Sequence, residues 1–277
     1  MTTMTRSTTL DPGTPELAVA AYEPLARYYD RFTERSAYEP VIAQIESWAL
    51  AQGLAGKRLL DVACGTGKSF IPMLERGYEL TACDISPAMV DEARLKAPTA
   101  EIVVADMRRL PWTGAFDLIT CLDDAVNYLL TEEDLHAAMA SMAAALAPDG
   151  ILVFDANSLG TYRSDFAESF EVESAGTRFL WSGEASPDAE PGSVVSATMT
   201  IEAPDGTDVS RHVQRHWPVE LLRDACVEAG FAHVQLRGLA IGPRLAGEPD
   251  ELSDLKIVCL AARPEAKRAR SEERARA

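Results

Sequence analysis

Three aspartates accompany successive short apolar runs, and a glycine-rich turn follows the first run. Asp61 lies in LLDVACGTGKSF, Asp84 ends the run TACD, and Asp106 ends VVAD. The turn after the first run contains Gly65 and Gly67. A glycine turn between a strand and a helix presents backbone N–H groups and the positive end of the helix at the carboxyl edge of a sheet, where α/β folds bind ligands. The pattern therefore predicts a ligand site at this edge.

The ligand is expected to be an adenosine that carries no pyrophosphate. Loops that bind NAD or FAD have a third glycine for close packing of helix on strand, but Phe70 occupies that place here. The carboxylate of Asp84 can accept hydrogen bonds from both ribose hydroxyls. The carboxylate of Asp106 can accept one from the exocyclic amine of an adenine while Met107 backs the ring. A nicotinamide-dependent oxidoreductase is the weaker alternative.

The elements that position these residues alternate between apolar runs and amphipathic segments. Strands are expected over 57–64, 79–84, 101–106, 116–122 and 150–156. Helices are expected over 67–77, 86–97, 131–147 and 219–230, with two more at the start, over 15–28 and 38–52. This alternation is typical of a doubly wound parallel sheet, which two strands near 232–239 and 255–262 would complete.

The alternation of apolar runs with amphipathic segments is interrupted between residues 160 and 217. Antiparallel-looking pieces appear there, and the turn sequence APDG separates the last two. We expect five units: a flexible N-terminus (1–16), a cofactor-binding core with N-terminal helices (17–159), an antiparallel β insertion that acts as a lid over the substrate (160–217), the C-terminal part of the core (218–263) and a flexible tail (264–277).

Composition excludes several classes of partner. The 277 residues carry a formal charge of −17, which repels phosphate backbones and anionic membranes. We therefore expect neither a nucleic acid nor a membrane as partner. The five cysteines show no CxxC pair, the sequence shows no run of about eighteen apolar residues, and the start lacks a signal-peptide pattern. A cytoplasmic protein without a bound metal is the expectation.

The ordered set of motifs resembles the class I S-adenosylmethionine-dependent methyltransferases. DVACGTG resembles their first motif, CDIS their ribose-binding motif, ADM their adenine motif, and FDLITCLDDAVNYL the strand that ends at the reaction centre. The resemblance implies an α/β fold with a doubly wound, Rossmann-like, seven-stranded sheet, with S-adenosylmethionine as cofactor and S-adenosylhomocysteine as product. It implies cofactor contacts at Asp61, Ala63, Gly65, Gly67, Asp84, Ile85, Met89, Asp106, Met107 and Leu122.

A finer resemblance is to bacterial small-molecule methyltransferases with a tyrosine-rich N-terminal helix and a β insertion. AYEPLARYYDRF resembles their opening segment, DDAVNYL their D-S-L-N-Y-L stretch, and HVQRHWP their H-x-Q-R-x-Y-P strand. By this resemblance Tyr22 or Tyr29 closes over the cofactor. It also implies substrate contacts at Asp124, Tyr128, Gln214 and Arg215.

Three residues are candidates for the chemistry of methyl transfer to a small molecule. Asp123, or Asp124 beside it after the fourth strand, could hold the ammonium of an amine acceptor, whereas His212 could remove the proton of a hydroxyl or phenol. The acidic loop favours nitrogen over oxygen. A non-catalytic protein that binds S-adenosylmethionine is the other open alternative.

Overall fold

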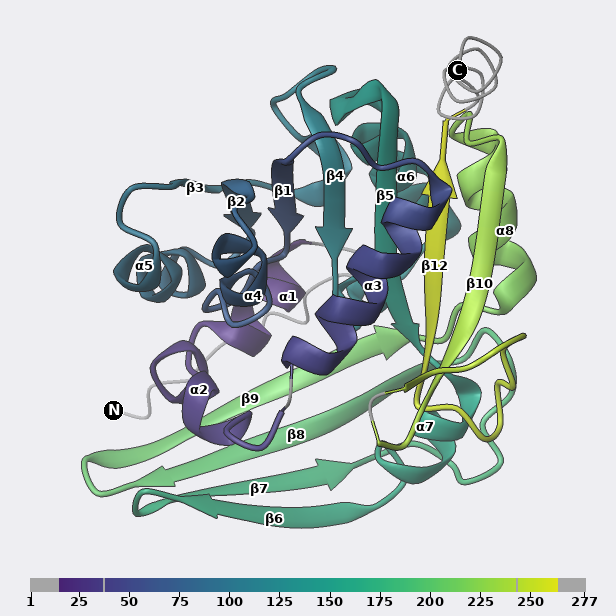
Figure 1. The fold of residues 1–277 in the computed structure, drawn as a ribbon. Helices are drawn as coiled ribbons and strands as arrows, with labels where there is room; N and C mark the ends of the chain where they lie inside the picture. The colour runs from purple at the N-terminus through teal and green to yellow at the C-terminus, as the bar shows by residue number, and fades with distance from the viewer. Residues whose placement is uncertain (1–14, 37, 243, 264–277) are drawn as a thin grey trace, which may run out of the picture.

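The computed structural model describes residues 15–36, 38–242 and 244–263 (Figure 1). The expected tail, 264–277, and most of the expected flexible N-terminus lie outside the described residues. Pro15 and Glu16 do not fit that N-terminal unit, because they already belong to helix α1 (Pro15–Tyr22). Proline is favoured in the first turn of a helix, where its missing N–H would have no partner.

A mostly parallel sheet forms the core, in the order β11-β10-β12-β5-β4-β1-β2-β3. Its parallel strands are β1 (Arg58–Val62), β2 (Glu79–Asp84), β3 (Glu101–Val104), β4 (Phe116–Cys121) and β5 (Leu146–Asn157). The antiparallel strands are β12 (Lys256–Ala262), β10 (His233–Ala240) and β11 (Arg244–Leu245). The doubly wound α/β class is confirmed.

The expected count of seven strands is one too low for the described residues, which form an eight-stranded sheet. The additional strand, β11, has two residues and pairs with the end of β10. A two-residue strand has no alternating apolar pattern, so the sequence carries no signal for it.

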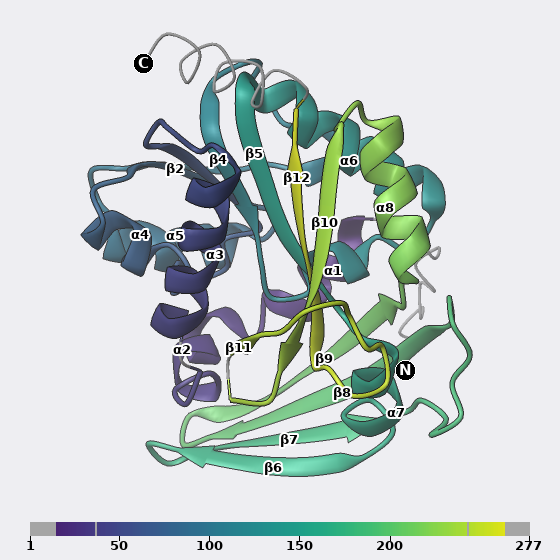
Figure 2. The ribbon, with the colours of Figure 1, turned by 45° about the vertical axis from the view of Figure 1, so that its right-hand side comes forward.

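Helices cover both faces of this sheet, as Figure 2 shows. One face packs on α3 (Tyr38–Gln52), α4 (Ile71–Glu75) and α5 (Pro87–Lys96), which contribute buried side chains such as Ile45, Met73 and Val90. The other face packs on α6 (Glu132–Ala145) and α8 (Val219–Glu228) through residues such as Met139 and Leu222. Each fully buried side chain of this size contributes about 1.5–3 kcal/mol, so the two layers hold the sheet edges rigid.

The first expected helix, 15–28, is broken into three pieces: α1, a 3-10 turn η1 (Ala26–Tyr28) and α2 (Tyr29–Phe32). Pro24 explains the break, because proline has no N–H to donate and disfavours helical geometry in the residue before it. As a result Tyr22 and Tyr29 lie on separate segments.

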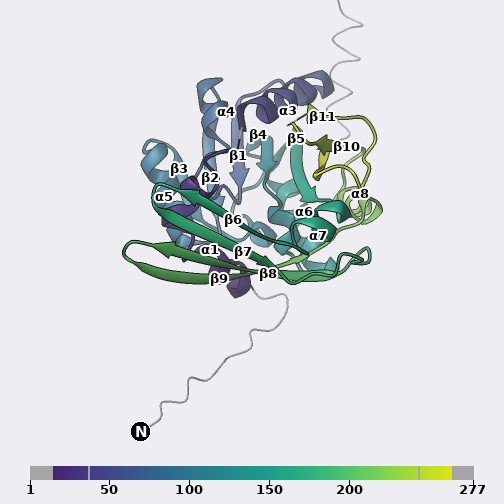
Figure 3. The same cartoon turned by 90° about the horizontal axis from the view of Figure 1, so that it is seen from below.

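A second, antiparallel sheet lies below the carboxyl ends of the parallel strands (Figures 1 and 3). It follows helix α7 (Leu159–Ser164) and has the order β6-β7-β8-β9, with β6 (Ser169–Ser174), β7 (Thr177–Gly183), β8 (Val194–Ala203) and β9 (Gly206–Arg215). The antiparallel character expected for this region is confirmed, with β6 as an additional strand. Two short 3-10 segments, η2 (Met107–Arg109) and η3 (Ala125–Tyr128), follow β3 and β4 on the side that faces this sheet.

Candidate active site

The turn after β1 is held in shape by two carboxylates with different surroundings. Asp84, at the end of β2, accepts from the backbone N–H of Gly65 at 2.9 Å and from that of Ser86 at 2.9 Å. Asp61 accepts from the hydroxyls of Thr120 at 2.6 Å and Ser69 at 2.8 Å. Burial raises the pKa of both carboxyls, that of Asp61 to about 6. The amides of the turn are thereby oriented before any ligand arrives.

Phe70 explains why the turn has two glycines and not three. Gly67 has φ +88°, and a Cβ added to it would lie 2.2 Å from Cζ of Phe70. The phenyl ring therefore packs directly on the α-carbon of Gly67 and is itself buried. Where a dinucleotide loop has a third glycine for close helix packing, this chain fills the space with an aromatic ring.

A cavity with an empty volume of about 640 Å³ opens beside this turn. Its described lining includes most of the residues expected to contact the cofactor: Tyr22, Tyr29, Ala63, Gly65, Asp84, Ile85, Met89, Met107 and Leu122. Tyr38, Lys68 and Ser69 also line it and were not expected from the sequence. The cavity is therefore built from the carboxyl ends of β1, β2 and β4 with the N-terminal segment as its cover.

Three of the expected cofactor residues lie elsewhere. Asp61 and Gly67 are not among the residues that line the cavity, because Asp61 points into the loop it braces and Gly67 lies under Phe70. Asp106 lines an adjoining cavity of about 470 Å³ together with Met107. Its carboxylate is bonded to the guanidinium of Arg108, with Nη2 at 2.6 Å. An adenine amine would therefore share this carboxylate with Arg108.

The N-terminal segment is tied to the glycine turn by polar contacts. The hydroxyl of Thr66 donates to Asp30 Oδ1 at 2.6 Å, and the hydroxyl of Ser86 donates to Glu23 Oε2 at 2.8 Å. These contacts hold Tyr22 and Tyr29 against the cavity, with their ring centroids 6.2 Å apart. A closed cover of this kind excludes water from the space beneath it.

A second cavity, of about 1,090 Å³, lies between the first cavity and the antiparallel sheet. Five residues line both: Tyr22, Tyr29, Tyr38, Asp123 and Tyr128. Asp124, His212 and Gln214 line the second cavity, as expected for substrate or catalytic residues. The two spaces therefore meet at four tyrosines and one carboxylate.

Arg215 does not line either cavity, which differs from the expected substrate contact. Neighbouring residues of a strand point to opposite faces, so the residue after Gln214 points away from the cavity. Its guanidinium instead bonds the carbonyl of Leu130 at 3.1 Å and the carboxylate of Glu132 at 3.1 Å. Arg215 thus joins β9 to the start of α6.

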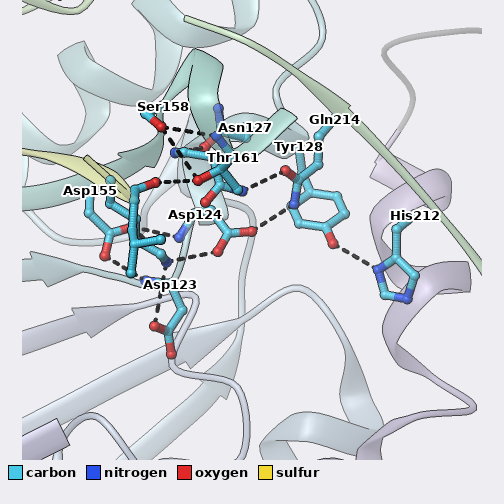
Figure 4. A network of polar contacts seen from close by, with 12 residues as sticks. Asp123, Asp124, Asn127, Tyr128, Asp155, Ser158, Thr161, His212 and Gln214 are labelled. Carbon is cyan, nitrogen blue, oxygen red and sulfur yellow. Dashed lines mark hydrogen bonds and ion pairs between the residues drawn. The ribbon is translucent and has the colours of Figure 1, made fainter. Parts of the chain in front are cut away.

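An acidic cluster around one lysine forms the polar end of the second cavity (Figure 4). Lys256 Nζ lies 2.8 Å from Asp124, 3.4 Å from Asp155 and 3.6 Å from Asp123. Burial disfavours the charge of Lys256, but the three carboxylates outweigh burial and raise its pKa well above the ordinary value. The pKa of Asp155 rises to about 6 because the group is buried, although Lys256 opposes the rise.

The same cluster fixes an unusual turn. Asp123 and Asp124 both have positive φ, +59° and +54°, which is uncommon for residues other than glycine. Their backbone N–H groups donate to Asp155 at 3.1 and 2.6 Å. Gln214 Nε2 donates to Asp124 Oδ2 at 2.6 Å, and the hydroxyl of Tyr38 donates to Asp123 Oδ2 at 2.7 Å. A strained backbone that several surrounding hydrogen bonds hold in place is frequent at functional sites.

His212 lies on β9 with both ring nitrogens engaged. Nδ1 is 2.8 Å from the hydroxyl of Tyr128 (Figure 4). Nε2 is 3.1 Å from the hydroxyl of Ser210. Burial lowers the pKa of His212 to about 4. The imidazole is therefore neutral at pH 7. It contacts two residues that line the first cavity, Tyr128 through the hydrogen bond and Tyr22 edge-on, with ring centroids 5.5 Å apart.

The residues that the sequence did not indicate come from distant elements. Lys256 begins β12 opposite Asn157, the last residue of β5, and this pairing brings its amine to the carboxyl edge. Asp155 stands at the end of an apolar run, a signal of the same kind as Asp84. Tyr38 starts α3 with no local motif around it, so nothing in the sequence marks it.

The described part of the chain contains no group of three or more His, Cys, Asp or Glu side chains arranged to hold a metal ion. It also contains no helix with the length and apolar character needed to span a bilayer.

The strand order, the glycine turn on β1, the acid that ends β2 and the cavity between them define a class I S-adenosylmethionine-dependent methyltransferase. The two cavities meet at an opening lined by tyrosines. The expected alternative of a nicotinamide-dependent oxidoreductase is wrong.

Comparison with known proteins agrees. Residues 59–150 match the sequence family described as "Methyltransferase domain". The chain is 30% identical over 218 residues to the methyltransferase-family protein YqeM of Bacillus subtilis (strain 168), covering 76% of this chain and 86% of that one. The chain therefore belongs to this methyltransferase family.

Two further similarities concern proteins named for amino sugars. The chain is 30% identical over 151 residues to the dTDP-4-amino-2,3,4,6-tetradeoxy-D-glucose N,N-dimethyltransferase of Saccharopolyspora spinosa, covering 47% of this chain and 61% of that one. It also resembles the structure of an S-adenosylmethionine-bound amino pentose methyltransferase from Micromonospora echinaspora, with TM-score 0.66, 23% identity and coverage of 86% and 96%. The second similarity supports the fold.

Proposed function

We propose that this protein transfers the methyl group of S-adenosylmethionine to a nitrogen of a small-molecule amine. The first cavity would hold the cofactor, with Asp84 at the ribose hydroxyls and Ile85 and Met107 beside the adenine. The methionine part would lie toward Gly65 and Leu122, near the opening to the second cavity. The acceptor would occupy the second cavity.

The position of Asp123 carries this proposal. Its carboxylate lines both cavities, and its side chain is 42% exposed, so it faces the space where the two reactants meet. Tyr38 and the backbone bonds to Asp155 fix its orientation. A fixed carboxylate at this point favours an ammonium group and can accept the proton that the nitrogen must lose.

The surroundings of His212 favour nitrogen over oxygen. A hydroxyl acceptor needs a base close to it, but both imidazole nitrogens are bonded to protein hydroxyls and burial lowers the pKa of the ring to about 4. An amine has a neutral form that attacks without further activation. We therefore propose that His212 positions Tyr128. Asp123, and not His212 as expected from the sequence, is the proposed general base. The name of the Saccharopolyspora spinosa relative, an N,N-dimethyltransferase, points the same way.

In the proposed mechanism the chain mainly orients and encloses. When bound, S-adenosylmethionine would supply an electrophilic methyl carbon to the acceptor nitrogen, with the neutral thioether of S-adenosylhomocysteine as the leaving group. Tyr22, Tyr29 and Tyr128 surround the opening between the cavities and exclude water there. Alignment of two bound reactants can contribute about 7–11 kcal/mol. Asp123 would then receive the proton that leaves nitrogen.

The first test is calorimetric. Titration with S-adenosylhomocysteine should show binding in the micromolar range, and titration with NADH should show none. The reaction is then tested by mass spectrometry on matched acceptors that differ only in an amino or a hydroxyl group. The proposal requires methylation of the amino compounds, whereas methylation of the hydroxyl compounds alone would reject it. Cofactor binding without turnover of any acceptor would favour the non-catalytic alternative.

The matched variant is Asp123→Asn. It should lower kcat/KM for an amine by about 10- to 100-fold, the scale of a hydrogen bond to a charged group, while leaving S-adenosylhomocysteine binding nearly unchanged. Asp188→Asn, in a turn outside both cavities, serves as control.

A further inference from the structure

The second cavity, which is proposed to hold the acceptor, has two different ends. One end is polar and contains Asp123, Asp124, Asn157 and Gln214. The other end is apolar and aromatic, with contributions from the N-terminal segment, from the loop after α7 and from the antiparallel sheet: Leu25, Phe32, Phe166, Phe170, Trp181 and Met199. A ligand that fills the cavity would place a polar group at the first end and an apolar body at the second.

The aromatic end is rigid without a ligand. The indole N–H of Trp181 donates to the carbonyl of Asp165 at 2.7 Å, which fixes the plane of the ring. Phe170 stacks on Trp181 with ring centroids 6.0 Å apart, and Phe166 meets it edge-on at 5.2 Å. A preformed aromatic wall favours a ring or apolar body over a fully hydrated one, because less order is lost on binding.

The charge of the cavity disfavours phosphate. Three carboxylates line it, those of Asp123, Asp124 and Asp165. Among the described lining residues only Lys256 carries a positive charge, because His212 is neutral at pH 7. That amine is already matched by Asp124 at 2.8 Å and by Asp155 at 3.4 Å. Phosphate sites present Arg, Lys or several free backbone N–H groups, and this cavity has no unpaired cation among those residues to offer.

We propose that the acceptor is an amine carried on an aromatic or apolar ring and free of phosphate. This inference rests on the proposed function, and it separates the chain from the Saccharopolyspora spinosa relative, whose name specifies a dTDP-linked sugar. The amine lies at Asp123, and the ring lies against Trp181 and Phe166.

The test uses four probes: tyramine, tyramine O-phosphate, glucosamine and glucosamine 6-phosphate. Their dissociation constants are measured by calorimetry on protein saturated with S-adenosylhomocysteine, so the order of affinities does not depend on turnover. Tyramine should bind at least about tenfold more tightly than its phosphate and than glucosamine, since one unit charge or one aromatic contact accounts for a factor of this size. A phosphate that binds as well as its parent amine overturns the charge argument. Equal affinity for tyramine and glucosamine, or binding of neither, overturns the aromatic argument.

Two variants sharpen this test. Trp181→Ala should weaken tyramine binding by about tenfold and leave glucosamine unchanged, whereas Leu180→Ala, at the neighbouring position of β7 and outside the cavity, should affect neither. Asp165→Lys should improve the binding of tyramine O-phosphate relative to tyramine. No change in that ratio would contradict the proposed effect of charge. Failure of the proposed function would appear separately, as methylation of oxygen or absence of methylation with the affinity order intact.

Discussion

The hydroxyl of Tyr128 lies 2.8 Å from Nδ1 of His212, although the two residues are 84 positions apart in the chain. Tyr128 lines both cavities, whereas His212 lines only the second. The histidine therefore orients a tyrosine at the boundary between the two cavities.

This relationship predicts that the two side chains act as a unit. Tyr128→Phe and His212→Ala should each lower kcat by about tenfold, the upper range for one hydrogen bond, and the double variant should be no slower than either single variant. His212→Gln, which retains polar atoms near the tyrosine, should restore part of the activity. Additive losses measured in steady-state kinetics would show that the two residues act independently.

The buried imidazole also predicts a pH dependence of stability. The pKa of His212 is about 4 in the folded protein against an ordinary value of 6.5, so the unfolded chain binds the extra proton between these values. The contribution of His212 to the free energy of unfolding is therefore fully present above pH 6.5. It decreases as the pH drops toward 4, by about 3 kcal/mol at most.

Denaturant titrations of the wild type and His212→Phe at pH 5 and pH 7.5 test this. The wild type should lose more stability than the variant on acidification. The buried carboxyls of Asp61 and Asp155, whose pKa values of about 6 give the opposite pH dependence, cancel in the comparison because both proteins contain them. Equal acid sensitivity of the two proteins would contradict the lowered pKa.

The turn after β1 predicts unequal effects at its two glycines. Gly65→Ala and Gly67→Ala both place a side chain at positive φ, which costs about 1–2 kcal/mol. At Gly65 a Cβ has no neighbour within 4 Å, whereas at Gly67 it would collide with the ring of Phe70. The free energy of unfolding should therefore fall further for Gly67→Ala than for Gly65→Ala. Equal losses would show that Phe70 can move aside without cost.

Asp84 is predicted to govern cofactor affinity. Asp84→Ala should weaken S-adenosylhomocysteine binding by about 1.5–3 kcal/mol, the scale of hydrogen bonds to a charged group. Asp91→Ala, on the exposed part of α5, is the matched control. Calorimetry that finds equal affinity for both variants would reject the assignment of Asp84 to the ribose.

Lys256 is predicted to be essential for stability rather than only for binding. Lys256→Met leaves the buried carboxylates without their cation and should cost about 3–5 kcal/mol near pH 8. The loss should shrink as the pH falls from about 8 toward 6, because without Lys256, which opposes the rise, the pKa of Asp155 lies above its wild-type value of about 6 and the carboxyl of the variant is protonated first.

The control for this prediction is Lys57→Met, because Lys57 forms a half-exposed pair with Glu46. The free energy of unfolding of Lys57→Met should fall by less than about 1 kcal/mol, both near pH 8 and at the lower pH. A deficit in Lys256→Met that did not depend on pH would show that packing, not charge, is what the lysine contributes.

Local signals explain what could be predicted from the sequence. Apolar runs gave the strands of the core, and Asp84 could be placed at the sheet edge because it directly follows such a run. The expected helix over 131–147 corresponds to α6, which begins where the hydroxyl of Thr131 accepts from the backbone N–H of Asp134 at 3.1 Å. Each of these features depends on residues within a few positions of one another.

The sequence by itself determined the fold class and the glycine turn with its neighbouring acids, because periodicity and turn chemistry act over short distances. Only the tertiary structure decided which side chains meet. It turned Gln214 toward the second cavity and Arg215 away from it, and it brought Lys256 to Asp124 across 132 positions. These outcomes depend on how β9 and β12 pack against the ends of other strands, and no local pattern encodes that packing.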